Sequence, residues 1–187
     1  MSNAELEKKI AKQIKMINNE RGICLFCSQS ESYHKVNGII LKELTNKYKF
    51  TGIYVTLNKE HSFLEKNLKK GGTDVSKLYF IDGTSKNNEK NNTNNCTFIS
   101  SPQSLTELSL AISAVTESGK FAFLFLDSIS TLLVYNDLKT VEKFTNYLIN
   151  KIRNLKIVGI IITLDDEGES KKLNTIISQF CDAYIKL

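Results

Sequence analysis

The sequence predicts a three-layer α/β/α sandwich, in which helices cover both faces of a mainly parallel β-sheet. The strongest observation comes from residues 121–126, where six consecutive apolar residues include three phenylalanines. Such a run fits a strand that is buried on both faces, as a parallel sheet under two helical layers requires. Short apolar runs also alternate with amphipathic segments along the rest of the chain, which is the pattern of βαβ units.

Length and composition are those of a single soluble domain. The chain has 187 residues, of which 41% are hydrophobic and 24% are charged. No apolar run approaches the roughly 18 residues of a membrane span, and no signal segment opens the chain. We therefore expect a cytoplasmic protein with an amphipathic helix in residues 1–20 and one domain in residues 21–187.

The helices are indicated by apolar residues at helical spacing. Residues 1–4 resemble a cloning remnant and are set aside; the first helix then carries an apolar stripe and is expected to end at Gly22. That stripe consists of Leu6, Ile10, Ile14 and Ile17. Further helices are expected at residues 36–48, 60–70, 129–134, 141–155 and 173–180, and in a segment that begins at Ser101 or Ser104 with Pro102 in its first turn.

The strands are the short apolar runs between these helices. They are expected at residues 23–27, 51–57, 77–81, 96–99, 121–126, 156–164 and 183–187. Gly71 and Gly72 are expected to stop the helix that precedes the third strand. The Asn/Lys-rich residues 84–95 predict a disordered loop.

The central apolar strand stops abruptly at Asp127. In open α/β sheets, ligands bind in the crevice beyond the carboxyl ends of the strands, so an aspartate there suits a metal or phosphate site. A second interpretation is that Asp127 or Ser128 only caps the helix that follows. The acidic turn at residues 165–169 is likewise interpreted as the N-terminal cap of a helix.

Other chemistry has less support in the sequence. Cys24 and Cys27 have the spacing of a redox or zinc motif, but residues three apart on a strand point to opposite faces, so free thiols are expected. His34 and His61 are too far apart in sequence to indicate a local metal site, and we expect no metal. The net charge of +5 comes from dispersed lysines, and only two arginines are present, which weighs against nucleic acid as a partner.

Three stretches together resemble a known family. They are residues 123–128, an apolar strand that ends in Asp-Ser; residues 101–109, which lead into the preceding helix; and residues 180–185, where an aspartate precedes the last strand. In this order they resemble the RecA-like ATPase core, specifically the KaiC-like branch common in archaea, over roughly residues 20–187. The resemblance implies a RecA-like fold with an ATP site, in which Asp127 stands at the Walker B position.

The segment that should hold the phosphates departs from the pattern of that family. A Walker A loop has two glycines, a lysine and a hydroxyl residue that together cradle phosphate and Mg²⁺. Residues 28–35 read Ser-Gln-Ser-Glu-Ser-Tyr-His-Lys, with no glycine, with His34 in place of the lysine and with Lys35 in place of the hydroxyl. A shift of one residue puts Lys35 in the lysine position but brings Val36 to the hydroxyl position, and Glu31 adds negative charge.

A second departure follows the second strand. The resemblance implies acidic residues there that activate water, whereas this chain has Asn58 and Lys59, neither of which can act as that base. We therefore expect a catalytically inactive domain that serves as a regulatory, signalling or protein-interaction module. Its expected partner is another protein, such as a homologous ATPase or a second copy in a homo-oligomer, and not a membrane.

Weak binding of ATP and Mg²⁺ in the degenerate pocket is the only cofactor interaction that we expect. Its candidate residues are Ser28, Ser30, Ser32, His34, Lys35, Asn58, Asp127 and Ser128, together with Lys59. One alternative is an ATP-binding protein or ATPase with an unconventional phosphate loop, in which His34 or Lys35 meets the phosphates and Asp127 holds Mg²⁺. Another is a nucleic-acid accessory domain, whose contacts would be Lys66, Lys69, Lys70, Lys86 and Lys90.

Overall fold

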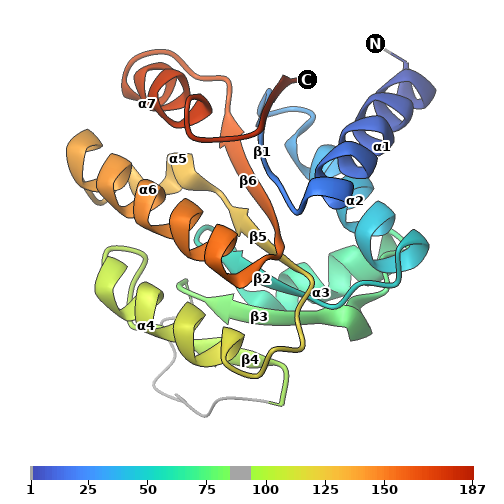
Figure 1. Ribbon diagram of the computed structural model, residues 1–187, viewed down its shortest axis with the longest axis horizontal. Helices are drawn as coiled ribbons and strands as arrows, with labels where there is room; N and C mark the ends of the chain where they lie inside the picture. Colours follow the sequence, from blue (N-terminus) through green and yellow to red (C-terminus); the bar gives the residue numbers. More distant parts are fainter. Residues whose placement is uncertain (1, 85–93) are drawn as a thin grey trace.

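The computed structural model describes residues 2–84 and 94–187. Within this part of the chain, seven parallel strands form one sheet in the order β4-β3-β2-β5-β6-β1-β7 (Figure 1). Most of the loop predicted at residues 84–95 lies outside the described residues. The strands are β1 (Ile23–Ser28), β2 (Gly52–Thr56), β3 (Leu78–Asp82), β4 (Cys96–Phe98), β5 (Phe123–Asp127), β6 (Val158–Leu164) and β7 (Ala183–Lys186).

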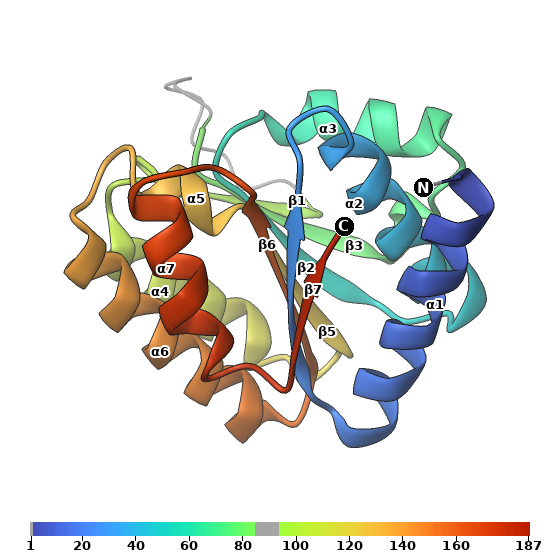
Figure 2. The same ribbon diagram turned by 90° about the horizontal axis from the view of Figure 1, so that it is seen from above.

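Helices cover both faces of this sheet, so the predicted three-layer sandwich is confirmed (Figure 2). One layer contains α1 (Asn3–Glu20), α2 (Tyr33–Lys42) with the π-helical turn η1 (Glu43–Lys47), and α3 (His61–Lys70). The other contains α4 (Leu105–Thr116), α5 (Ile129–Leu132), α6 (Leu138–Leu155) and α7 (Glu169–Ser178). A short 3₁₀ turn, η2 (Val75–Lys77), precedes β3. No helix of the described residues is long and apolar enough to span a bilayer.

The central strand β5 has one core on each side. Phe123 and Phe125 are fully buried in the cluster under α1, α2 and α3, whereas Leu124 and Leu126 are fully buried in the cluster under α4 to α7. This arrangement follows from the two-residue period of a strand, which sends successive side chains to opposite faces. It confirms that the phenylalanine-rich run is an interior strand.

Helix ends account for most of the differences from the sequence prediction. Helix α1 begins at Asn3 with a capping box between Ser2 and Glu5, so the first residues belong to the fold, and it ends at Arg21 in the left-handed conformation rather than at Gly22. Helix α2 begins at Tyr33, three residues earlier than expected, because the polar segment before Val36 continues into its first turn.

The starts of α4 and α7 match the expectation in part: the N-cap residue of α4 is Ser104, one of the two expected residues, and α7 begins within the acidic turn. Pro102 lies ahead of α4, whose N-cap residue is Ser104, so it is not in the first turn. The N-cap residue of α7 is Gly168, without a side-chain cap bond, and the carboxylate of Asp165 instead forms an ion pair of 2.8 Å with Lys186 of β7. The acidic turn therefore ties the last strand to the end of β6.

The strand order places a crevice at the carboxyl ends of the central strands. The chain leaves β1 through α2 and crosses to β2 on the far side of β5, whereas it leaves β6 through α7 and crosses back to β7 beside β1. These two connections run in opposite directions, and such a switch point is where open α/β sheets bind ligands. A functional site is therefore expected in this crevice.

Candidate functional site

The connection between β1 and α2 stands where a phosphate loop is expected. It consists of the four residues between Ser28 and Tyr33. The buried Ser28 Oγ donates a hydrogen bond of 2.9 Å to the carbonyl of Gln29, and Ser32 Oγ donates one of 3.2 Å to the same carbonyl. The hydroxyls of this connection are therefore directed at its own backbone, and Ser30 is exposed.

Tyr33 is packed directly behind this connection. It begins α2, is only 6% exposed, and packs its ring edge against the ring of His34. Its hydroxyl accepts a hydrogen bond of 2.9 Å from Nδ2 of Asn58, which lies after β2 where the resemblance implies an acidic residue that activates water. Asn58 therefore has a structural role, holding the N-terminus of α2 against the end of β2.

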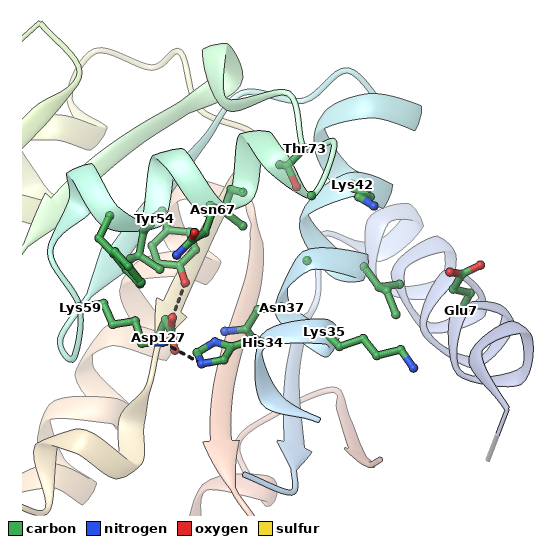
Figure 3. Close-up of a pocket in the computed structure, with 16 residues that line it drawn as sticks. Glu7, His34, Lys35, Asn37, Lys42, Tyr54, Lys59, Asn67, Thr73 and Asp127 are labelled. Carbon is green, nitrogen blue, oxygen red and sulfur yellow. Dashed lines mark hydrogen bonds between the residues drawn. The ribbon is translucent and has the colours of Figure 1, made fainter. Parts of the chain in front are cut away.

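A pocket opens beside this corner, between α2 and α3 (Figure 3). Its volume is about 610 Å³, which lies within the usual range for small-molecule sites. Tyr54 of β2 and Asp127 of β5 lie at the sheet end of the pocket, and His34 and Lys59 lie beside them (Figure 3). The pocket extends along both helices and away from the β1–α2 connection.

Asp127 is held in this pocket as a buried acid. Its side chain is 1% exposed, and Oδ2 accepts a hydrogen bond from the hydroxyl of Tyr54, whereas Oδ1 has no hydrogen-bond partner among the described residues. Burial raises the pKa of Asp127 well above its ordinary value, and burial also raises the pKa of Tyr54. The carboxyl group is therefore favoured in its neutral form.

Two basic side chains meet at the mouth of the pocket. Lys59 Nζ lies 2.7 Å from His34 Nε2, and burial together with the charge of Lys59 lowers the pKa of His34. A neutral imidazole that accepts a hydrogen bond from the ammonium explains this contact. Lys35 donates a hydrogen bond to Asn3 of α1, which holds its ammonium to the neighbouring helix.

The predicted site residues thus divide into two groups. His34, Lys35 and Asp127 line one pocket, together with Lys59. The remaining five are distributed around the β1–α2 connection, the corner at Tyr33 and the start of α5: Ser28, Ser30, Ser32, Asn58 and Ser128. Ser128 occupies the N-cap position of α5 without a cap bond, and its hydroxyl lies 3.1 Å from that of Thr131, so neither Ser128 nor Asp127 is a side-chain cap.

Sequence reasoning missed several residues of the pocket. Asn37, Tyr54 and Thr73 line it and are buried, but the sequence indicates only that Tyr54 lies within an apolar strand. Asn37 gave the one usable signal, because it is a polar residue between apolar positions of a predicted helix. Nothing in the local pattern indicated that Thr73, after the end of α3, would reach the same pocket.

The chain's cysteines include the pair Cys24 and Cys27, which lie on opposite faces of β1. All four are free thiols, Cys24 belongs to the cluster under α1, and Cys27 accepts a 3.7 Å hydrogen bond from Asn174 of α7 on the other face. Within the described residues, no group of three or more His, Cys, Asp or Glu side chains could hold a metal ion.

Comparisons with known proteins agree with this fold. The family model described as "ATPase: KaiC" matches residues 41–187, which begins beyond the β1–α2 connection. A KaiC-like protein from the hyperthermophilic archaeon Pyrococcus horikoshii has a similar crystal structure, with a TM-score of 0.67 and 14% sequence identity over 89% of this chain and 71% of that chain. No curated protein sequence matches. Because the family match spans most of its length, the chain belongs to the KaiC family of ATPase domains.

Proposed function

We propose that this chain is a KaiC-family domain that does not hydrolyse ATP and that acts as a regulatory module by binding another protein. The observation that carries the proposal is the connection between β1 and α2. It is four residues long and contains no glycine, the hydroxyls of Ser28 and Ser32 both donate to its Gln29 carbonyl, and the buried ring of Tyr33 follows it. These residues do not fit a triphosphate.

The physical cost of this replacement is large. Phosphoryl transfer depends almost entirely on positioning the phosphates and neutralising their charge. Removal of a single charge-stabilising donor typically lowers a rate by about 10²–10³-fold. This chain lacks the glycine cradle, the lysine and the hydroxyl together, and Asn58 stands where a base would be needed. Useful turnover is therefore not expected.

The state of Asp127 supports the same conclusion. Mg²⁺ prefers ionised carboxylates with near-ideal octahedral geometry. Asp127 is favoured as a neutral acid, bonded to Tyr54 and buried under α2 and α3. Its position at the end of the strand matches the Walker B pattern, but its protonation and its partner do not suit a metal ligand.

Exposed apolar side chains support a protein partner. Large apolar side chains are exposed along α4, α6 and the turn between α5 and α6, namely Leu110, Val134, Tyr135 and Tyr147. Val134 is 75% exposed and Leu110 is 65% exposed, values that leave most of each side chain in water. A partner that buries them would gain about 25 cal/mol for each Å² of apolar surface.

Isothermal titration with Mg-ATP, combined with a phosphate-release assay, tests the loss of ATP turnover. We expect no micromolar binding and no release above a protein-free control. Micromolar binding that Asp127→Ala abolishes, followed by turnover, would instead support the alternative of an unconventional phosphate loop and would overturn the proposal.

Sedimentation of the chain with an active KaiC-family ATPase tests the partner. We expect a complex that Val134→Ser weakens and that Tyr184→Ser, a change at an exposed side chain of β7, leaves intact. Equal binding by wild type and both variants would argue against a contact at Val134. The absence of a complex with wild type would argue against this class of partner.

A further inference from the structure

Unpartnered polar atoms gather in the pocket between α2 and α3. Among the described residues, five buried side-chain oxygen or nitrogen atoms have no hydrogen-bond partner, and three of them line this one pocket. They are Asp127 Oδ1, Asn37 Oδ1 and Thr73 Oγ1, on side chains that are 1%, 4% and 5% exposed. Buried polar groups in native proteins almost always have a partner, so a cluster of orphans points to a missing ligand.

The sheet end of the pocket presents one hydrogen-bond donor and one acceptor. Asp127 and Asn37 both line the pocket, and each has a buried oxygen without a partner (Figure 3). Because Asp127 is neutral and its Oδ2 accepts from Tyr54, its Oδ1 carries the O–H and donates, whereas Asn37 Oδ1 accepts. A ligand edge that has an acceptor beside an N–H donor would satisfy both. Lys59 at the mouth repels a cationic group, so a neutral amino or amide group fits better than an ammonium.

The middle of the pocket is apolar. Ile39 of α2 and the side chains of Phe63, Leu64 and Leu68 of α3 supply the apolar part of the pocket's lining. Gly38 also lines the pocket, and a Cβ atom built on it would meet nothing within 4 Å. This section therefore has room for a flat, weakly polar body such as a heterocycle with its sugar.

The far end of the pocket carries a different chemistry. Thr73, with its orphan hydroxyl, and Lys42 at the last residue of α2 lie at the end opposite Asp127 (Figure 3). An ammonium and a hydroxyl together are suited to an acid group. Glu7 of α1 also lines this part of the pocket, and its carboxylate limits how much negative charge the end can accept.

We propose that the α2–α3 pocket binds a nucleoside monophosphate, with the base on Asp127 and Asn37 and the phosphate near Lys42 and Thr73. One edge of the base supplies an acceptor for Asp127 and a neutral amino donor for Asn37, its ring and sugar fill the apolar section, and its single phosphate lies near the ammonium of Lys42 and the hydroxyl of Thr73. The phosphate lies toward the C-terminal end of α2, whereas a phosphate loop would hold it at the N-terminal end. The site is therefore separate from the triphosphate position, and it does not depend on the proposed function.

Isothermal titration of the full chain with three probes tests the pairing of each end. AMP carries an amino group at one end and a phosphate at the other, IMP has a carbonyl in place of that amino group, and adenosine lacks the phosphate. We expect AMP to bind at least about tenfold more tightly than IMP or adenosine. Equal affinities for the three, or no heat of binding for AMP up to about 1 mM, would overturn the proposal.

A variant that fills the pocket tests its location. Gly38→Leu adds a side chain to the open space and replaces a helical glycine, so the protein should fold with an unfolding temperature no lower than wild type. AMP affinity should fall by at least about tenfold in Gly38→Leu and stay within about twofold in Asn150→Leu, a matched change on the exposed face of α6.

Undiminished AMP binding by a folded Gly38→Leu chain would place the nucleotide elsewhere and refute the inference. Phosphate release from ATP, measured on the same preparations, tests only the loss of turnover. Its appearance would overturn the proposed function and leave the result with AMP intact.

Discussion

Replacement of Tyr54 by phenylalanine should destabilise the folded chain, because it removes the only hydrogen bond that the structure gives to the Asp127 carboxyl among the described residues. Both side chains are 1% exposed, and Oδ1 of Asp127 already lacks a partner. An acceptor left unpaired in the interior costs about 1–3 kcal/mol. For a chain of this size, 1 kcal/mol shifts the unfolding temperature by about 2–4 °C, so we expect a decrease between about 2 and 12 °C.

Urea unfolding at neutral pH, followed by circular dichroism, measures this loss. The matched control is Tyr79→Phe, which removes a hydroxyl 2.9 Å from Oγ1 of Thr97 at a half-buried position of β3. Water can replace that bond, so the control should lose no more than about 1 kcal/mol. A loss below about 0.5 kcal/mol for Tyr54→Phe would show that Asp127 does not depend on Tyr54.

Two further predictions concern the pH dependence and the packing of the sheet. Burial raises the pKa of Asp127 above its unfolded value, so its favourable contribution is complete below the unfolded pKa and is lost as the pH rises through the folded pKa. Asp127→Asn removes that loss, so its free energy of unfolding minus that of wild type should increase as the pH rises from acid to neutral, which urea unfolding at several pH values measures. A difference that decreases over this range would contradict a raised pKa. Gly52→Ala should lower the free energy of unfolding by about 1–3 kcal/mol, because its Cβ would overlap the ring of Phe123. Gly38→Ala, in open space on a helix, should raise it by about 0.5–1 kcal/mol. Calorimetry that finds Gly52→Ala more stable than Gly38→Ala would refute this packing.

Periodicity was sufficient for the sheet and its layers. Within the run at residues 121–126, the residues from Phe123 to Leu126 are buried, whereas Phe121 and Ala122 are half-buried and precede β5. The apolar stripe of α1 is buried as its spacing indicated, because side-chain direction is fixed by backbone geometry. Helix ends were less predictable, since Arg21 and Gly168 end or begin helices through backbone conformation rather than through a characteristic side chain. These errors were a few residues long and left the topology unchanged.

The site was only partly predictable. Asp127, His34 and Lys59 could be proposed because each follows a strand or begins a helix at the carboxyl edge of the sheet. Tyr54, Asn37 and Thr73 could not, because their roles depend on how α2 and α3 lie across the sheet and on a contact between two strands far apart in sequence. Packing between elements, rather than local pattern, determines which of these atoms stay without partners.

The opposite orientation of Cys24 and Cys27 gives the molecule two built-in reporters. Burial raises the pKa of both thiols, so neither should react with a disulfide reagent until its side of the sheet opens. Cys24 reports the separation of α1 from β1, and Cys27 reports the separation of α7 from the same strand. In a chain whose other two cysteines are replaced, the labelling rates of Cys24 and Cys27 would separately measure how often the helical layer on each face of the sheet opens.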